Sequence, residues 1–316
     1  MIVTQFTKMV GCKFPIQQAG MGRGTATPRL ASAVSNAGGL GMLSLSGYSP
    51  SVIQKIIETT KVLTNKKIGA NFLLNNAVPN ECIAKASENL DVIDFFWANP
   101  DKNIVKIVHA GGALAGWQVG SLKEAKLAES VGCDFVIVQS IEAGGHIRGH
   151  QKRIELLNEV IEKISIPILA SGGFGSSNAI SEVLKNGIAG VRCGTRFLAA
   201  KESNAHPEYI KHLIESNASD TLYTDKFCIG WPNAPHRVLK SCIEAAENFN
   251  GEYVGHSIDP NTREKKDIPR FGCVDIHSGL CGCIDAMPQW AGRSVDYVCK
   301  RESVAEIINQ LMECQH

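Results

Sequence analysis

The first group in the sequence that could do chemistry is His146, which follows two glycines in "EAGGHIRGH" (142–150). An unperturbed imidazole titrates at about pH 6.5, so this side chain can accept or give a proton near neutral pH. An apolar run of strand type, "FVIVQ" (135–139), comes just before it. A histidine that only hydrogen-bonds its own turn would have the same local sequence. The catalytic interpretation therefore depends on what the neighbouring segments carry.

Two further turns have the composition of a phosphate-binding site. "ASGGFGSSNAI" (170–180) runs from a strand through a double glycine to a helix opened by Ser176 or Ser177. "GVRCGTRFL" (190–198) again gives a strand, a glycine and a threonine. Glycines let the backbone approach a ligand closely, and free N–H groups at a helix start favour a phosphate. The alternative is that these glycines only form turns. Because both loops have the composition of a phosphate-binding turn, we favour phosphate binding.

The cysteines indicate free thiols rather than a metal site or disulfides. Cys273, His277, Cys281 and Cys283 have the spacing C-x3-H-x3-C-x-C, which departs from the C-x2-C pairs of zinc sites. The eleven cysteines are spread along the chain. The N-terminal segment shows no basic-then-apolar signal pattern. We expect a reduced, cytoplasmic protein without a bound metal.

The elements that must position these groups alternate between strand type and helix type up to about residue 194. Helical segments at 27–39, 49–63 and 121–132 open on threonine or serine. The expected strands are 15–19, 40–45, 67–72, 94–98, 114–119, 135–139, 167–171 and 190–194. This alternation predicts an α/β fold with eight parallel strands, a TIM (β/α)8 barrel. Two approximate matches to the dinucleotide fingerprint, 20–25 and 173–178, are too incomplete to favour a doubly wound sheet.

The alternating pattern breaks after the eighth strand. Residues 203–285 run into a stretch rich in Gly, Pro and Cys (267–292), and we expect 203–285 to form an inserted, smaller and mostly helical subdomain that covers the substrate site. Residues 1–202 and 286–316 would form the barrel, with 303–315 as its closing helix. The net charge is +1, and no apolar run approaches the ~18 residues of a membrane span. We expect neither a nucleic-acid nor a membrane partner.

The strand ends predict a large cofactor. In a TIM barrel the active-site groups gather at the C-terminal ends of the strands, and a phosphate often binds after the last two strands. Here those ends carry small residues and neutral amides, without paired carboxylates or a His/Asp/Glu metal set. Such a rim is suited to hold a large polar cofactor through backbone and amide contacts.

Several segments together resemble the nitronate monooxygenase family, formerly called 2-nitropropane dioxygenase-like, whose members are FMN-dependent TIM barrels. The segments are "PIQQAGMG", "LASAVSNAGGLGML", "GANFLL", "EAGGHIRGH", "ASGGFGSSNAI", "GVRCGTRFLAAKESNAHPEY" and "GWPNAPHRVL". The resemblance covers nearly the whole chain. "EAGGH" and "SGG…GTRF" are also shared with the flavin-dependent enoyl-ACP reductases of the FabK type.

The resemblance implies a set of FMN-binding residues and makes His146 the catalytic residue. Ala19, Gly20, Met21 and Gly145 would lie near the isoalloxazine ring; Asn71, Gln118 and Gln139 would bind its polar rim or the ribityl chain; and Ser171, Gly172, Gly173, Gly194 and Thr195 would hold the phosphate. In "QWAGRSV" (289–295), Arg293 replaces a glutamine usual in the family, which could place a positive charge near the site.

The activity implied first is oxidation of small alkyl nitronates with O2, with His146 as base or as a substrate contact. The alternative is a flavin reductase of the enoyl-ACP or quinone type, with NAD(P)H as reductant. A barrel that binds flavin or phosphate without turnover is the third possibility. The resemblance leaves a homodimer open.

Overall fold

The computed structural model describes residues 3–258 and 264–313 of the 316-residue chain. Eight parallel strands form one sheet in the order β1-β9-β8-β6-β5-β4-β3-β2. These strands are β1 (Ile16–Gln18), β2 (Gly41–Ser44), β3 (Ile68–Leu73), β4 (Val92–Phe96), β5 (Leu114–Val119), β6 (Phe135–Gln139), β8 (Ile168–Ser171) and β9 (Gly190–Cys193). Each lies within two residues of its predicted range, and the predicted TIM barrel is confirmed.

The barrel closes where β1 meets β2. A parallel bridge joins Gln17 to Leu40. The side-chain amide of Gln18 extends this seam, because its Nε2 donates to the carbonyl of Met42 at 2.9 Å and its Oε1 accepts from the Met42 amide at 3.4 Å. A side-chain amide can replace a backbone ladder pair in this way because it carries both a donor and an acceptor.

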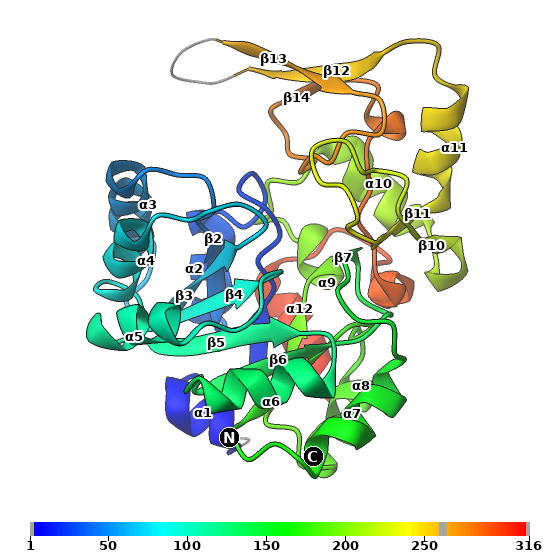
Figure 1. The fold of residues 1–316 in the computed structure, drawn as a ribbon. Coiled ribbons are helices and arrows are strands. Elements are labelled where there is room, and N and C mark those ends of the chain that lie inside the picture. The colour runs from blue at the N-terminus through cyan, green and yellow to red at the C-terminus, as the bar shows by residue number, and fades with distance from the viewer. Residues whose placement is uncertain (1–2, 259–263, 314–316) are drawn as a thin grey trace.

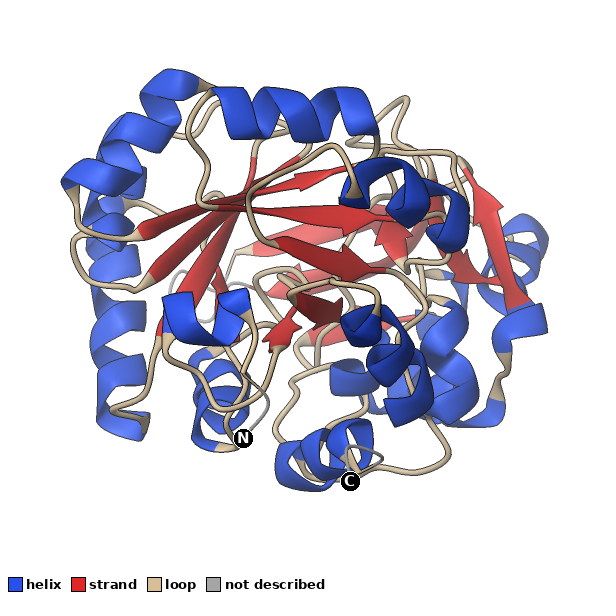
Figure 2. Ribbon diagram, turned by 90° about the horizontal axis from the view of Figure 1, so that it is seen from below, coloured by secondary structure: helices blue, strands red, loops and turns tan. Residues whose placement is uncertain are grey.

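Helices surround the strands (Figure 2). They are α2 (Pro28–Asn36), α3 (Pro50–Leu63), α4 (Asn80–Ser87), α5 (Lys102–Ala110), α6 (Leu122–Ser130), α7 (Arg153–Ile161), α8 (Ser177–Lys185) and α12 (Val304–Met312). Two serine N-caps predicted from the sequence are present: Ser121 accepts from the Glu124 amide, and Ser176 from that of Ala179. Thr27 and Ser49 stand at the N-cap positions of α2 and α3 but make no side-chain cap hydrogen bond. The predicted closing helix is α12; positions 314 and 315 of that prediction lie outside the described residues.

The N-terminal end of the barrel is plugged by α1 (Gln5–Val10). Phe6 of this helix packs edge-on against Phe135 inside the barrel, with ring centroids 5.8 Å apart. Phe6 and Phe135 belong to one buried cluster with Met42 and Leu169. Because this end is filled by apolar side chains, the open end for chemistry is the carboxyl end of the strands, where the insertion lies (Figure 1).

The segment between β9 and α12 differs from the predicted mostly helical subdomain. It contains α9 (Thr195–Leu198), α10 (Pro207–Glu215), η1 (Ala218–Asp220), β10 (Thr221–Thr224), β11 (His236–Leu239), α11 (Lys240–Asn248), β12 (Tyr253–Ile258), β13 (Lys265–Pro269), β14 (Leu280–Gly282), η2 (Ile284–Ala286) and η3 (Arg293–Tyr297). Its five strands, together with β7, form two three-stranded sheets, β10-β11-β7 and β13-β12-β14. The first sheet needs β7 (Gly145–His146) from a barrel loop, so a local pattern could not reveal it.

The insertion has a buried core of its own, which extends from Leu198 to Val298 and includes Tyr209 and Met287. No helix among the described residues is long and apolar enough to cross a membrane.

Candidate active site

A buried ion pair that the sequence reasoning missed lies inside the barrel. Arg192 on β9 donates from Nη2 to Oδ2 of Asp94 on β4, and both side chains are almost fully buried. Gln17 on β1 bonds both partners: its Nε2 donates to Asp94 Oδ2 at 3.0 Å, and its Oε1 accepts from Arg192 Nε at 3.0 Å. The sequence carries one signal for this ion pair: a charged residue stands within each of two apolar strands, "VIDFF" and "GVRC". Buried charges are almost always paired, so the two could have been expected to meet.

This network positions two of the predicted cofactor amides. Asn71 Nδ2 donates to Asp94 Oδ1 at 2.5 Å, and Gln118 Oε1 accepts from Arg192 Nη1 at 2.7 Å. In each of these two side-chain amides, one of the two polar atoms is therefore bonded to the ion pair. The oxygen of Asn71 and the nitrogen of Gln118 make neither of these two bonds.

The loop after β1 lies directly beside this network. Ala19 donates its amide to the carbonyl of Cys193 at 2.8 Å, which holds the loop against β9. A Cβ at Gly20 would lie 2.6 Å from Cβ of Asn71, so only glycine fits there. Ala19, Gly20 and Met21 are all half-buried. The structure therefore brings these three residues together with Asn71.

The two glycine turns also meet at this end of the barrel. Gly172 and Gly173 have φ values of 110° and 77°, in the region that favours glycine. Gly194 is different, because its φ of −115° suits any residue and a Cβ would make only ordinary contacts with Ala19 and Met21, at 3.4 to 3.9 Å. Nothing inside the protein requires glycine at 194. A ligand that approaches this backbone closely would account for a glycine here, and a phosphate is such a ligand.

Ser171 and Thr195 flank the glycines of this cradle. Ser171 is the last residue of β8, and its carbonyl accepts from the Ser140 amide at 3.0 Å. Thr195 begins α9, and its Oγ1 accepts from the Gly292 amide at 3.1 Å. That bond connects the 289–295 segment to the cradle. The side chain of Arg293, in the same segment, is exposed.

His146 lies in the loop that follows β6. It pairs with His236 of β11, which attaches this loop to the insertion. Gln139 Nε2 donates to the carbonyl of His146 at 2.9 Å, and Gln139 Oε1 accepts from the Arg148 amide at 3.4 Å. The amide of Gln139 therefore braces the loop. Gly145 has a φ of 72°, and no protein atom lies within 4 Å of a Cβ placed there.

Aromatic side chains enclose the imidazole of His146. Trp231 stacks on it with ring centroids 3.8 Å apart and planes at 25°, and Trp97 and Trp290 lie at 5.9 and 5.0 Å. Burial, together with the neighbouring His236, lowers the pKa of His146 to about 3. The ring is therefore neutral at pH 7, with one nitrogen as donor and the other as acceptor.

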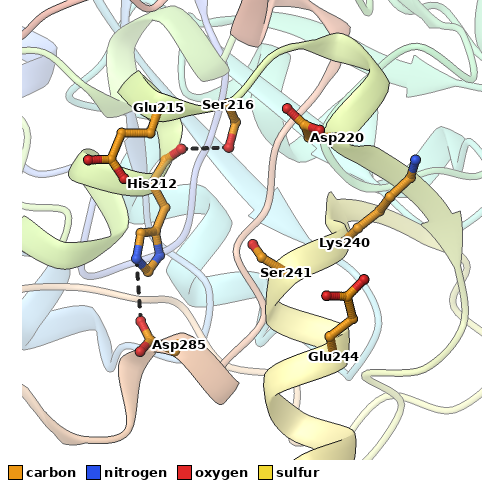
Figure 3. A pocket seen from close by; sticks show the side chains of 8 residues that line it. All are labelled: His212, Glu215, Ser216, Asp220, Lys240, Ser241, Glu244 and Asp285. Carbon is orange, nitrogen blue, oxygen red and sulfur yellow. Dashed lines mark hydrogen bonds and ion pairs between the residues drawn. The ribbon is translucent and has the colours of Figure 1, made fainter.

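A separate polar hollow lies within the insertion, between α10, η1, α11 and η2 (Figure 3). Its lining residues are His212, Glu215, Ser216, Asp220, Lys240, Ser241, Glu244 and Asp285. His212 Nε2 lies 3.4 Å from Asp285 Oδ1. None of the predicted site residues lines this hollow, so it is distinct from the predicted cofactor site.

Comparisons of sequence place the chain among known enzymes. A family model described as nitronate monooxygenase matches residues 4–92 and 84–313. A (3aS,4S,5R,7aS)-5-hydroxy-7a-methyl-1-oxo-octahydro-1H-indene-4-carboxyl-CoA dehydrogenase of Rhodococcus jostii (strain RHA1) is 34% identical over 254 residues, covering 80% of this chain and 70% of that protein. A probable nitronate monooxygenase of Bacillus subtilis (strain 168) is 26% identical over 355 residues, covering 99% of each.

Comparisons of structure agree with those of sequence. FabK from Thermotoga maritima superposes with a TM-score of 0.82 at 25% identity, over 99% of this chain and 96% of that chain. The nitroalkane oxidase from Streptomyces ansochromogenes gives a TM-score of 0.78 at 22% identity, over 98% and 99%. With the family model matching almost the whole described chain, this protein belongs to the nitronate monooxygenase family of oxidoreductases.

Proposed function

We propose that this chain binds FMN at the carboxyl end of the barrel and oxidises alkyl nitronates with O2. Family membership supports the reaction class, and the glycine cradle at Gly194 supports a phosphate-bearing cofactor. Bound FMN would supply the redox chemistry, carrying electrons from the nitronate to O2. The protein supplies the position of the substrate and its hydrogen bonds.

The FMN-binding residues divide into three groups according to their place in the barrel. The backbone of Ser171, Gly172, Gly173, Gly194 and Thr195 would hold the phosphate. Asn71 and Gln118, fixed by the buried ion pair, would bind the polar parts of the cofactor, and Ala19, Gly20, Met21 and Gly145 would lie along the ring. Gln139 would act by holding the loop of His146.

The neutral imidazole of His146 is the observation that favours a nitronate over a neutral nitroalkane. A group with a pKa of about 3 is a weak base, and each unit of pKa mismatch costs about tenfold in proton-transfer equilibrium. A nitronate is already deprotonated and needs no base. It needs a hydrogen-bond donor for its negatively charged oxygen, and a neutral imidazole offers one N–H.

The test is oxygen consumption by the FMN-loaded protein with an alkyl nitronate and with the corresponding neutral nitroalkane. We expect turnover of the nitronate and a rate at least ~100-fold lower with the nitroalkane, because general-base catalysis contributes on that scale. His146→Ala should retain FMN and lose at least ~10-fold in nitronate turnover. His150→Ala is the matched control, since His150 is exposed and its Nδ1 contacts the hydroxyl of Tyr223 at the edge of the loop. Failure of the FMN-loaded protein to consume oxygen with any nitronate would overturn the proposal.

A second function is favoured by the named relatives. One is a carboxyl-CoA dehydrogenase and another is FabK, so oxidoreduction of an acyl thioester with NAD(P)H is the competing reaction. Anaerobic mixing with NADPH separates the two functions. Rapid loss of the visible flavin absorbance, followed by its return with an enoyl thioester, would support the reductase.

A further inference from the structure

Cys273 lies beside His146 and has no part in the site described so far. Its Sγ is 3.7 Å from Nε2 of His146, within hydrogen-bonding range for sulfur. The two residues are 127 positions apart in the chain. The sequence predicted that Cys273 is a free loop thiol rather than a metal ligand, and in the structure this thiol faces the imidazole of His146.

The backbone around Cys273 is held in place from two sides. Its amide donates to the carbonyl of Ile229 at 2.8 Å, and Ile229 lies two residues before Trp231. The carbonyl of Val274 accepts from the indole Nε1 of Trp290 at 3.1 Å. Both tryptophans also contact His146. The thiol, the stacked indole and the imidazole are therefore parts of one packed unit.

The protons of this pair can be assigned from the chemistry of the two groups. Burial raises the pKa of Cys273 to about 12, so sulfur carries its proton at pH 7, while His146 is neutral. An imidazole nitrogen is a better acceptor than a thiol sulfur. The thiol therefore donates to Nε2, and the single ring proton of His146 lies on Nδ1.

Two contacts then fix the ring completely. Stacking on Trp231 sets the plane of the imidazole. A half-turn about Cβ–Cγ would keep that plane but exchange Nε2 for Cε1, and the bond to Sγ would be lost. Cys273 thus selects one of the two flips and one of the two tautomers.

We propose that Cys273 is a positioning residue, which holds His146 as the Nδ1–H tautomer and so determines which N–H the substrate meets. The assignment of the tautomer rests on the contact between Sγ and Nε2 and on the protonation of the two groups, and it does not depend on the reaction that the protein catalyses. Its consequence for turnover rests on the proposed function.

The tautomer is tested by long-range 1H–15N spectra of protein labelled at the histidine ring nitrogens, at neutral pH. The His146 signals are identified by their loss in His146→Gln. We expect Nε2 to resonate as an unprotonated ring nitrogen in the wild type and in Cys273→Ser, and to gain the proton in Cys273→Ala. The control is Cys281→Ala, which replaces an exposed cysteine on β14, and its His146 signals should match those of the wild type. A wild-type His146 that carries its proton on Nε2 would overturn the assignment.

Turnover of a nitronate tests the consequence. Cys273→Ala should lower kcat about fivefold, the usual effect of losing one neutral hydrogen bond, and Cys273→Ser should recover most of it. A changed tautomer with unchanged kcat would refute the positioning role. Absence of nitronate oxidation in every protein, wild type included, would refute the proposed function and leave the tautomer result standing.

Discussion

Replacing Asp94 by asparagine would leave the guanidinium of Arg192 buried without its counter-charge. The substitution keeps the shape of the side chain, removes the negative charge and turns one of the two acceptor oxygens into an NH2 donor. Asp94 is fully buried, and its carboxylate receives hydrogen bonds from Arg192, Gln17 and Asn71. An uncompensated charge at such a position is among the few changes that destabilise a protein strongly.

The expected cost follows from the burial. Breaking a buried pair on one side costs about 3–5 kcal/mol. For 316 residues at about 2.1 cal/mol/K each, the entropy of unfolding is about 0.66 kcal/mol/K, so Tm should fall by about 5–8 °C. Glu247→Gln provides the matched control, because Glu247 pairs with Lys226 at the surface, where an ion pair contributes about 0–1 kcal/mol.

The assay is thermal unfolding of the flavin-free proteins at pH 7, followed by circular dichroism. The Asp94→Asn variant should unfold well below both the wild type and Glu247→Gln. If Asp94→Asn and Glu247→Gln unfold within about 1 °C of each other, the carboxylate does not compensate a buried charge and the reasoning fails.

Two other outcomes follow from the site. Gly194→Ala should keep the wild-type Tm, because its Cβ makes only ordinary contacts, yet weaken FMN binding at least ~10-fold, measured by fluorescence titration; unchanged affinity would remove Gly194 from the cradle. Acid should destabilise the protein through His146 and His236, whose pKa values are lowered, chiefly by burial. Between about pH 6.5 and about pH 3 the unfolded chain binds protons that the folded chain does not, so the free energy of unfolding falls as the pH falls through this window. His146→Gln should lose less stability than the wild type between about pH 7 and pH 5 in urea titrations, and equal slopes would contradict the lowered pKa of His146.

The barrel was predictable because its signals are local. Apolar runs of strand type, serine caps such as Ser121 and Ser176, and glycine stops all act within one or two turns of chain. Short-range periodicity therefore located the eight strands to within two residues. The insertion lacked such signals, since β11 pairs with β10 on one side and with β7 of a distant barrel loop on the other.

The site was predictable in part. The glycine turns and His146 stand out by residue type and by their place after strands. Asp94 and Arg192 did not, because their partnership depends on strands that are remote in the sequence and meet only when the barrel closes. The interpretation of Cys273 depended on its spacing to other cysteines. In the structure Cys273 instead contacts His146, which comes from another segment.

The sequence by itself determined the class of fold, and its strand ends predicted the end of the barrel at which chemistry takes place. These depend on periodicity and on residue types at strand ends, which are written along the chain. Only the tertiary structure decided the protonation of His146 and its neighbours. A pKa near 6.5 becomes one near 3 through burial among Trp97, Trp231 and Trp290, and burial is a property of segments that meet only in the folded protein.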